Sequence, residues 1–146
     1  MPTHQSGREA VTDDLRAMLI RHEGEVLKVY EDTRGIPTIG VGRNLQDAGI
    51  SHEEAMVLLD NDISRVSREV RQVFPWTADL DPVRGSALLD MAFNFGVHKF
   101  QMFPKFLAAM EAKDWPTAVQ ELATIHFTSA ARRTEITHMI EWGEAA

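Results

Sequence analysis

The chain of 146 residues contains no cysteine. Disulfide bonds, thiolate metal sites and thiol nucleophiles are therefore excluded, and the fold must be stabilised by its apolar core. Long apolar runs are also missing, because charged residues interrupt every stretch that approaches the roughly 20 residues that span a bilayer. With 15 Lys and Arg against 22 Asp and Glu, the net charge is -7. We therefore expect neither membrane insertion nor non-specific binding to nucleic acid.

Motifs for metals, nucleotides and export are missing too. The six histidines form no HExxH or His-x3-His pair, and Gly40–Gly42 lacks the third glycine of a dinucleotide-binding loop. We predict no metal and no cofactor. The polar start of the chain, Met1–Arg8, lacks the apolar core of a secretory signal. The expected location is the cytoplasm of the cell that makes the protein.

The sequence does contain strong helix signals. Ser51 and Glu54 have the spacing of a capping box, and the apolar stripe after them predicts a long helix over about residues 51–73. Another helix is predicted between Asp81-Pro82 and Gly96, because aspartate caps helices, proline suits their first position and glycine ends them. The apolar face of this second helix predicts the centre of the core: Ala87, Leu88, Met91, Ala92 and Phe95.

The N-terminal region contains signals for a helix followed by signals for short strands. Thr12 or Asp13 can cap a first helix, which ends at Glu23 because Gly24 follows. From Val26 to Leu45, β-branched and aromatic residues alternate with glycine and proline. This sequence pattern is typical of short strands joined by tight turns, so we predict a small β-hairpin element.

Further helices are predicted from Pro104, from Pro116 and over about 130–141. The expected fold is α+β, mainly helical and two-lobed, in a single domain of residues 1–146. The first helix and the β lobe occupy about 12–50, the connecting helix about 51–73 and the helical lobe about 81–143. A cleft between such lobes is the natural binding site.

Three polar side chains stand out in the N-terminal region. Glu23 ends the first helix, and Asp32 and Thr38 follow within the predicted β-hairpin element. Hydrolysis of a glycosidic bond needs a protonated carboxyl to protonate the leaving oxygen and an ionised carboxylate to activate water or stabilise positive charge. A buried helix end for Glu23 and a wetter hairpin for Asp32 would provide the two environments. The spacing of these three residues alone is also compatible with ordinary turns and a solvated helix end.

The surroundings of this triple closely resemble the active-site stretch of the phage-type lysozymes, the T4-lysozyme-like glycoside hydrolases of family 24. The matching segments are His22-Glu23-Gly24, Tyr30 to Gly35 and Pro37 to Gly42. The similarity continues through residues 50–55, 59–62 and 87–96, and covers most of residues 12–143. It implies a lysozyme fold with a small β-hairpin lobe and a helical C-terminal lobe.

The resemblance also implies an activity. Glu23 occupies the position of the general acid, Asp32 that of the base or electrostatic partner across the sugar, and Thr38 that of the residue that places the attacking water. The implied substrate is the β-1,4 bond between N-acetylmuramic acid and N-acetylglucosamine in bacterial peptidoglycan, with inversion at the anomeric carbon. Inversion needs a carboxyl separation of about 6.5 to 9.5 Å. We expect the enzyme to act as a monomer.

Supporting positions follow from the same resemblance. Arg133, or its neighbour Arg132, matches an arginine on the last helix that pairs with the catalytic glutamate. We also predict an ion pair between Arg43 and Asp62. The family lines its sugar groove at the positions of Phe93, Asn94, Phe103 and Phe106. Aromatic residues at helical spacing more often belong to the core, however, so we expect Phe93 to pack there. The predicted substrate-binding or supporting set is Arg133, Asn94, Phe103, Leu45, Arg43 and Asp62.

Some features depart from the family pattern. Phe127 stands about where many relatives have Trp, and Ser129-Ala130-Ala131 replaces a polar stretch. With the acidic charge, these departures leave open a catalytically weakened module that binds glycan or a protein partner. For an active enzyme, the resemblance implies phage-encoded lysis from the host cytoplasm. A virion part that opens the wall during entry is the other role.

Overall fold

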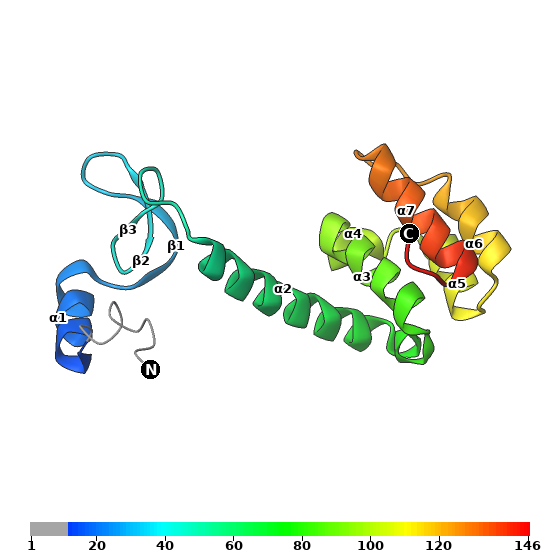
Figure 1. Cartoon of the computed structure of the whole chain (residues 1–146), viewed down its shortest axis with the longest axis horizontal. Helices are drawn as coiled ribbons and strands as arrows, with labels where there is room; N and C mark the ends of the chain where they lie inside the picture. The colour runs from blue at the N-terminus through cyan, green and yellow to red at the C-terminus, as the bar shows by residue number, and fades with distance from the viewer. Residues whose placement is uncertain (1–11) are drawn as a thin grey trace, which may run out of the picture. The chain divides into compact units, whose positions relative to one another are not determined.

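The computed structural model describes residues 12–146, which fall into two compact units divided between Met56 and Val57. Figure 1 colours the chain from blue at its start to red at its end. Helix α2 (His52–Val73) begins in the first unit and continues into the second. No helix among residues 12–146 is long and apolar enough to cross a bilayer.

Helix α1 (Asp13–Glu23) opens the first unit. The Thr12 side chain accepts a hydrogen bond from the backbone N–H of Leu15, and Gly24 ends the helix with φ of 75°. Both residues act as the sequence predicts, because the hydroxyl satisfies a free backbone N–H and glycine tolerates the left-handed region. Glu23 is therefore fixed as the last residue of the helix.

The sheet of the first unit is antiparallel, in the order β1 (Val26–Glu31), β2 (Pro37–Gly40), β3 (Arg43–Asn44). Thr38 of the central strand pairs with Tyr30 on one side and with Asn44 on the other. The register between β1 and β2 shifts between Val26 and Tyr30. The sheet places Thr38 at the centre of the unit, where it is 4% exposed.

The second unit contains the core. The 3-10 helix η1 (Pro75–Asp79) precedes α3 (Pro82–Phe95), which is followed by α4 (Val97–Phe100), α5 (Pro104–Glu111), α6 (Trp115–Leu122) and α7 (Ala130–Trp142). Helix α7 packs against α3 and α6, and α6 packs against α5. The largest fully buried side chains come from several helices: Val70, Leu88, Met91, Phe100, Phe106, Met110, Leu122, Ile136 and Ile140.

The prediction of an α+β, mainly helical fold is confirmed, and each predicted helix is present. Asp81 caps α3 by accepting from the N–H of Arg84, and Gly96 ends that helix. Four of the five predicted core residues of α3 are buried, whereas Phe95 is partly buried. The short helices η1 and α4 were outside the prediction because a single turn has almost no apolar periodicity.

Candidate active site

Glu23 projects from the end of α1 toward the turn between β2 and β3. A Cβ atom built on Gly42 would lie 2.7 Å from Glu23 Oε2, so the carboxyl group rests directly on this glycine. Within its unit Glu23 is exposed, so this unit alone does not provide the buried helix end that we expected. The helix ends at the surface of its unit, where the carboxyl is accessible to a large polar molecule.

Asp32 is held in the turn that connects β1 to β2. Its Oδ1 accepts hydrogen bonds from the backbone N–H of Arg34 at 2.8 Å and of Ile36 at 2.9 Å, and Oδ2 lies 3.8 Å from the Arg34 guanidinium. The Ile36 hydrogen bond is the main cause that lowers the pKa of Asp32 below its ordinary value, with further contributions from the Arg34 N–H and charge. Asp32 is therefore an ionised, oriented carboxylate at neutral pH.

Thr38 is connected to this turn by Ile36, the residue that also donates to Asp32. Its hydroxyl donates a hydrogen bond to the carbonyl oxygen of Ile36 at 2.8 Å. A hydroxyl that donates its proton in a fixed direction keeps lone pairs with which it can accept one from a water molecule. The structure thus brings Asp32 and Thr38 together on Ile36, in the same unit as the Glu23–Gly42 contact.

Arg43 has a different partner from the predicted one. Its guanidinium makes a bidentate ion pair with Glu54, at 2.9 and 2.8 Å, and also donates to the carbonyl oxygen of Gly49. Asp62 pairs instead with Arg65 at 2.9 Å, so the predicted pair of Arg43 with Asp62 is wrong. Asp62 lies eight residues beyond Glu54, about 12 Å further along the axis of α2, which is out of reach for an arginine held at the first turn.

Glu54 also completes the predicted capping box. Its Oε1 accepts from the backbone N–H of Ser51, whose hydroxyl accepts from the N–H of Glu54. One carboxylate therefore fixes the start of α2 and attaches β3 to it through Arg43. The side-chain hydrogen bond from Arg43 and the backbone hydrogen bond from Ser51 lower the pKa of Glu54 to about 2.

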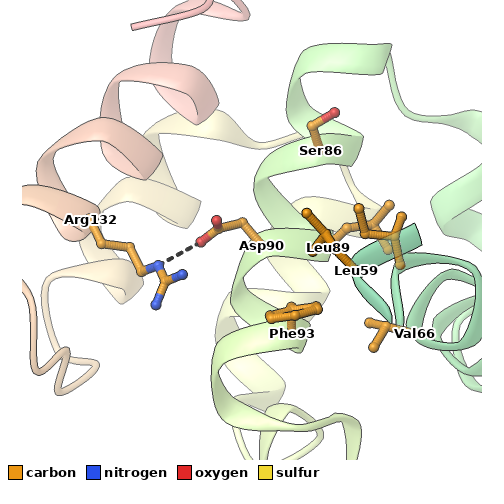
Figure 2. Close-up of a pocket in the computed structure, with 8 residues that line it drawn as sticks. Leu59, Val66, Ser86, Leu89, Asp90, Phe93 and Arg132 are labelled. Atoms are coloured by element: carbon orange, nitrogen blue, oxygen red, sulfur yellow. Dashed lines mark ion pairs between the residues drawn. The ribbon is translucent and has the colours of Figure 1, made fainter. Parts of the chain in front are cut away.

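The two neighbouring arginines of α7 have different surroundings. Arg132 pairs with Asp90 of α3 at 2.9 Å, as Figure 2 shows. Arg133 donates to the carbonyl oxygen of Ile125 at 2.8 Å, and its guanidinium lies 5.6 Å from the centre of the Phe127 ring. The buried Nε of Arg133 has no acceptor among the residues that the structure describes.

The remaining predicted residues lie apart from one another within their units. Asn94 is exposed on α3, Phe103 is half-buried with its ring 5.2 Å from that of Phe95, and Leu45 is half-buried after β3. Phe106 is buried in the core, whereas Phe93 is 45% exposed.

Phe93 lines an apolar groove of about 380 Å³ in the second unit. Figure 2 shows its ring beside Leu89 of α3 and opposite α2 side chains such as Val66, with the Arg132–Asp90 pair nearby. The expectation that Phe93 packs in the core is therefore wrong within this unit. The apolar periodicity of α3 identified its buried face, but it does not separate a core position from the wall of a groove.

The Phage lysozyme family matches residues 20–135, which include all three candidate catalytic side chains. The chain belongs to the phage lysozyme family. The predicted class, a lysozyme-type glycoside hydrolase, is thereby confirmed at the level of the family.

The proteins to which this chain is similar differ in how much of their length it matches. It is 32% identical to the pre-baseplate central spike protein Gp5 of Enterobacteria phage T4, over 75% of this chain but 25% of that protein. Identity to the endolysin of Salmonella phage P22 is 36%, over 56% of this chain and 60% of the endolysin. The probable T4-type lysozyme 1 of Dictyostelium discoideum is 25% identical, over 91% of this chain and 96% of that protein.

Proposed function

We propose that this protein hydrolyses the β-1,4 bond between N-acetylmuramic acid and N-acetylglucosamine in bacterial peptidoglycan. The observation that carries the proposal is the joint attachment of Asp32 and Thr38 to Ile36, in the unit where Glu23 contacts Gly42. An ionised carboxylate, a fixed hydroxyl and an accessible second carboxyl are the groups that glycoside hydrolysis requires. Membership of the phage lysozyme family supports the same reaction.

The three residues take separate roles. Glu23 donates its proton to the leaving glycosidic oxygen, and its exposure allows the sugar to reach the carboxyl. Asp32 remains negatively charged because its backbone hydrogen bonds favour the ionised form. Thr38 holds the attacking water through a lone pair of its oriented hydroxyl.

The proposed reaction is an inverting displacement by water. The oxygen of the water forms a bond to the anomeric carbon while the bond to the leaving oxygen breaks. Asp32 accepts the proton released by the water, and Glu23 supplies the proton that the leaving oxygen takes. Analysis of the first-formed product anomer by NMR tests this stereochemistry, since a retained configuration contradicts the water-attack geometry.

The resemblance to the phage lysozymes also implies roles for residues of the helical unit, which we retain as proposals. We propose that Arg133 orients Glu23. The buried Nε of Arg133 has no acceptor among the described residues, so it is free to donate a hydrogen bond. Arg132, paired with Asp90, is the alternative, and Asn94, Phe103 and Leu45 are proposed to contact the glycan.

We propose lysis of the host as the setting, with the enzyme held in the cytoplasm until it is released to the wall. The match to an endolysin supports this role. The match to a spike protein of a phage baseplate favours a second candidate, a wall hydrolase carried in the virion. Mass spectrometry of purified particles separates the two, because a virion part is present in stoichiometric amounts.

The decisive test is clearing of permeabilised Gram-negative cells by the purified protein and by Glu23→Gln. The variant removes the protonatable group and conserves its shape, so we expect loss of nearly all clearing with little change in thermal stability. Glu25→Gln is the matched control, because it makes the same change at an exposed position two residues away. Wild-type clearing by Glu23→Gln overturns the proposal, and an inactive wild type supports the binding module instead.

A further inference from the structure

Two glycines lie where β2 turns into β3: Gly40 is the last residue of β2, and Gly42 lies in the turn. Gly40 has φ of 68° and Gly42 has φ of 66°, both in the left-handed region. Their surroundings differ. A Cβ on Gly40 would meet nothing within 4 Å, whereas a Cβ on Gly42 would lie 2.7 Å from Glu23 Oε2 and 3.1 Å from its Cδ.

Backbone conformation alone therefore explains why Gly40 is glycine. An L-residue in the left-handed region is strained at either position, and that cost is about the same for both. At Gly42 a second requirement applies, because the carboxyl of Glu23 occupies the space of a side chain. A methyl group at 2.7 Å from an oxygen is far inside van der Waals contact, so one of the two groups must move.

The group that moves is the carboxyl. Glu23 is exposed and its side chain has rotatable bonds, so it can turn away from a new methyl group with little loss of stability. Catalysis is less tolerant, because a displacement of about 1 Å can reduce a rate by about 100-fold. Substitution of Gly42 should thus affect the rate much more than the fold.

We propose that Gly42 is a positioning residue for Glu23: the absence of a side chain allows the catalytic carboxyl to rest on the β2–β3 turn. This inference rests on the proposed role of Glu23 as general acid. Gly42 does not touch the substrate in this scheme. It acts only by defining where the carboxyl of Glu23 lies relative to the strand that carries Thr38.

The test compares Gly42→Ala with Gly40→Ala. Both variants introduce the same methyl group at the same φ, so we expect similar decreases in melting temperature. Measured well below that temperature, kcat on cell-wall glycan should fall about 100-fold for Gly42→Ala and less than about threefold for Gly40→Ala. The pH profile of kcat/KM should change only for Gly42→Ala. Equal activities in the two variants overturn the proposal.

A second pair of variants and a second readout complete the test. Asparagine tolerates the left-handed region, so Gly42→Asn and Gly40→Asn replace the alanine pair if it does not fold. The carboxyl carbon of Glu23, observed by NMR, should shift in Gly42→Ala and not in Gly40→Ala. This second readout needs no activity: an inactive wild type refutes the proposed function, whereas an unmoved Glu23 resonance refutes the positioning role of Gly42.

Discussion

Asp32 and Thr38 are joined by the main chain of Ile36. The N–H of Ile36 donates to Asp32 Oδ1 at 2.9 Å, and its carbonyl oxygen accepts from Thr38 Oγ1 at 2.8 Å. The same carbonyl also accepts from the backbone N–H of Asp32 at 3.0 Å. Because both side chains are oriented by one residue, their chemical roles are best tested by substitutions that preserve these hydrogen bonds.

Asp32→Asn removes the charge and keeps an oxygen that can accept from the N–H groups of Arg34 and Ile36. We expect kcat to fall by about 100-fold or more, the scale of acid and base catalysis, with a nearly unchanged melting temperature. Wall solubilisation and thermal melting measure the two quantities. Asp32→Ala, which leaves both N–H groups without their acceptor, should lose stability as well.

The matched control for Asp32 is Glu31→Gln, which removes a carboxylate from the exposed neighbouring position at the end of β1. It should retain wild-type turnover. If Asp32→Asn and Glu31→Gln have equal rates, Asp32 orders the turn and takes no part in the reaction.

Thr38→Val replaces the buried hydroxyl with a methyl group of similar size. The carbonyl of Ile36 still accepts from the N–H of Asp32, so the loss of stability should be only about 1 kcal/mol. We expect kcat to fall by about tenfold or more while KM changes little, because in the proposed mechanism the hydroxyl places water and does not bind sugar. Thr38→Ser retains the hydroxyl and should recover most of kcat; a Val variant with wild-type kcat would make Thr38 purely structural.

The parts of the fold that were predictable are those encoded locally. Thr12, Asp81 and the Ser51–Glu54 box each act on a backbone group within three residues, so sequence spacing alone defines where these helices begin. The catalytic candidates were found for a similar reason. Glu23 and its neighbours lie within 20 residues of one another, and the resemblance supplied the roles that spacing alone does not.

Contacts between distant segments were not predictable in this way. The choice of Glu54 over Asp62 as the partner of Arg43 depends on how far along α2 the strand β3 lies, and composition does not contain that distance. The contact of Glu23 with Gly42 was missed because a glycine between strands is fully explained by turn geometry. Asp90 offered no signal toward Arg132, since their contact depends on the packing of α3 against α7.

The ion pair of Arg43 with Glu54 should give the protein an acid-sensitive element. Arg43 and the Ser51 N–H lower the pKa of folded Glu54 from 4.5 to about 2, so this group stabilises the fold fully above pH 4.5 and loses that contribution as the pH falls toward 2. Glu54→Gln can still accept from Ser51 but loses the ion pair. Its melting temperature should be lower than that of the wild type at pH 6, and the difference should shrink below pH 4.5.

Glu53→Gln is the matched control for Glu54, because it makes the same change at an exposed position in the first turn of α2. Its difference from the wild type should be smaller at pH 6. A difference between Glu54→Gln and the wild type that is independent of pH would show that the ion pair contributes nothing to stability.

Arg84 should be one of the most sensitive polar positions in the helical unit. Its side chain is 14% exposed, donates from Nε to the carbonyl oxygen of Ile140 at 2.7 Å and lies 4.1 Å from the centre of the Trp115 ring. Lysine keeps the charge but not the planar fork, so Arg84→Lys should lower the free energy of unfolding by about 2 kcal/mol in urea titrations. Arg65→Lys, which alters an exposed pair, should cost less than about 1 kcal/mol. Equal losses would mean that the hydrogen bond from Arg84 to the carbonyl oxygen of Ile140 contributes no more to stability than an exposed ion pair does.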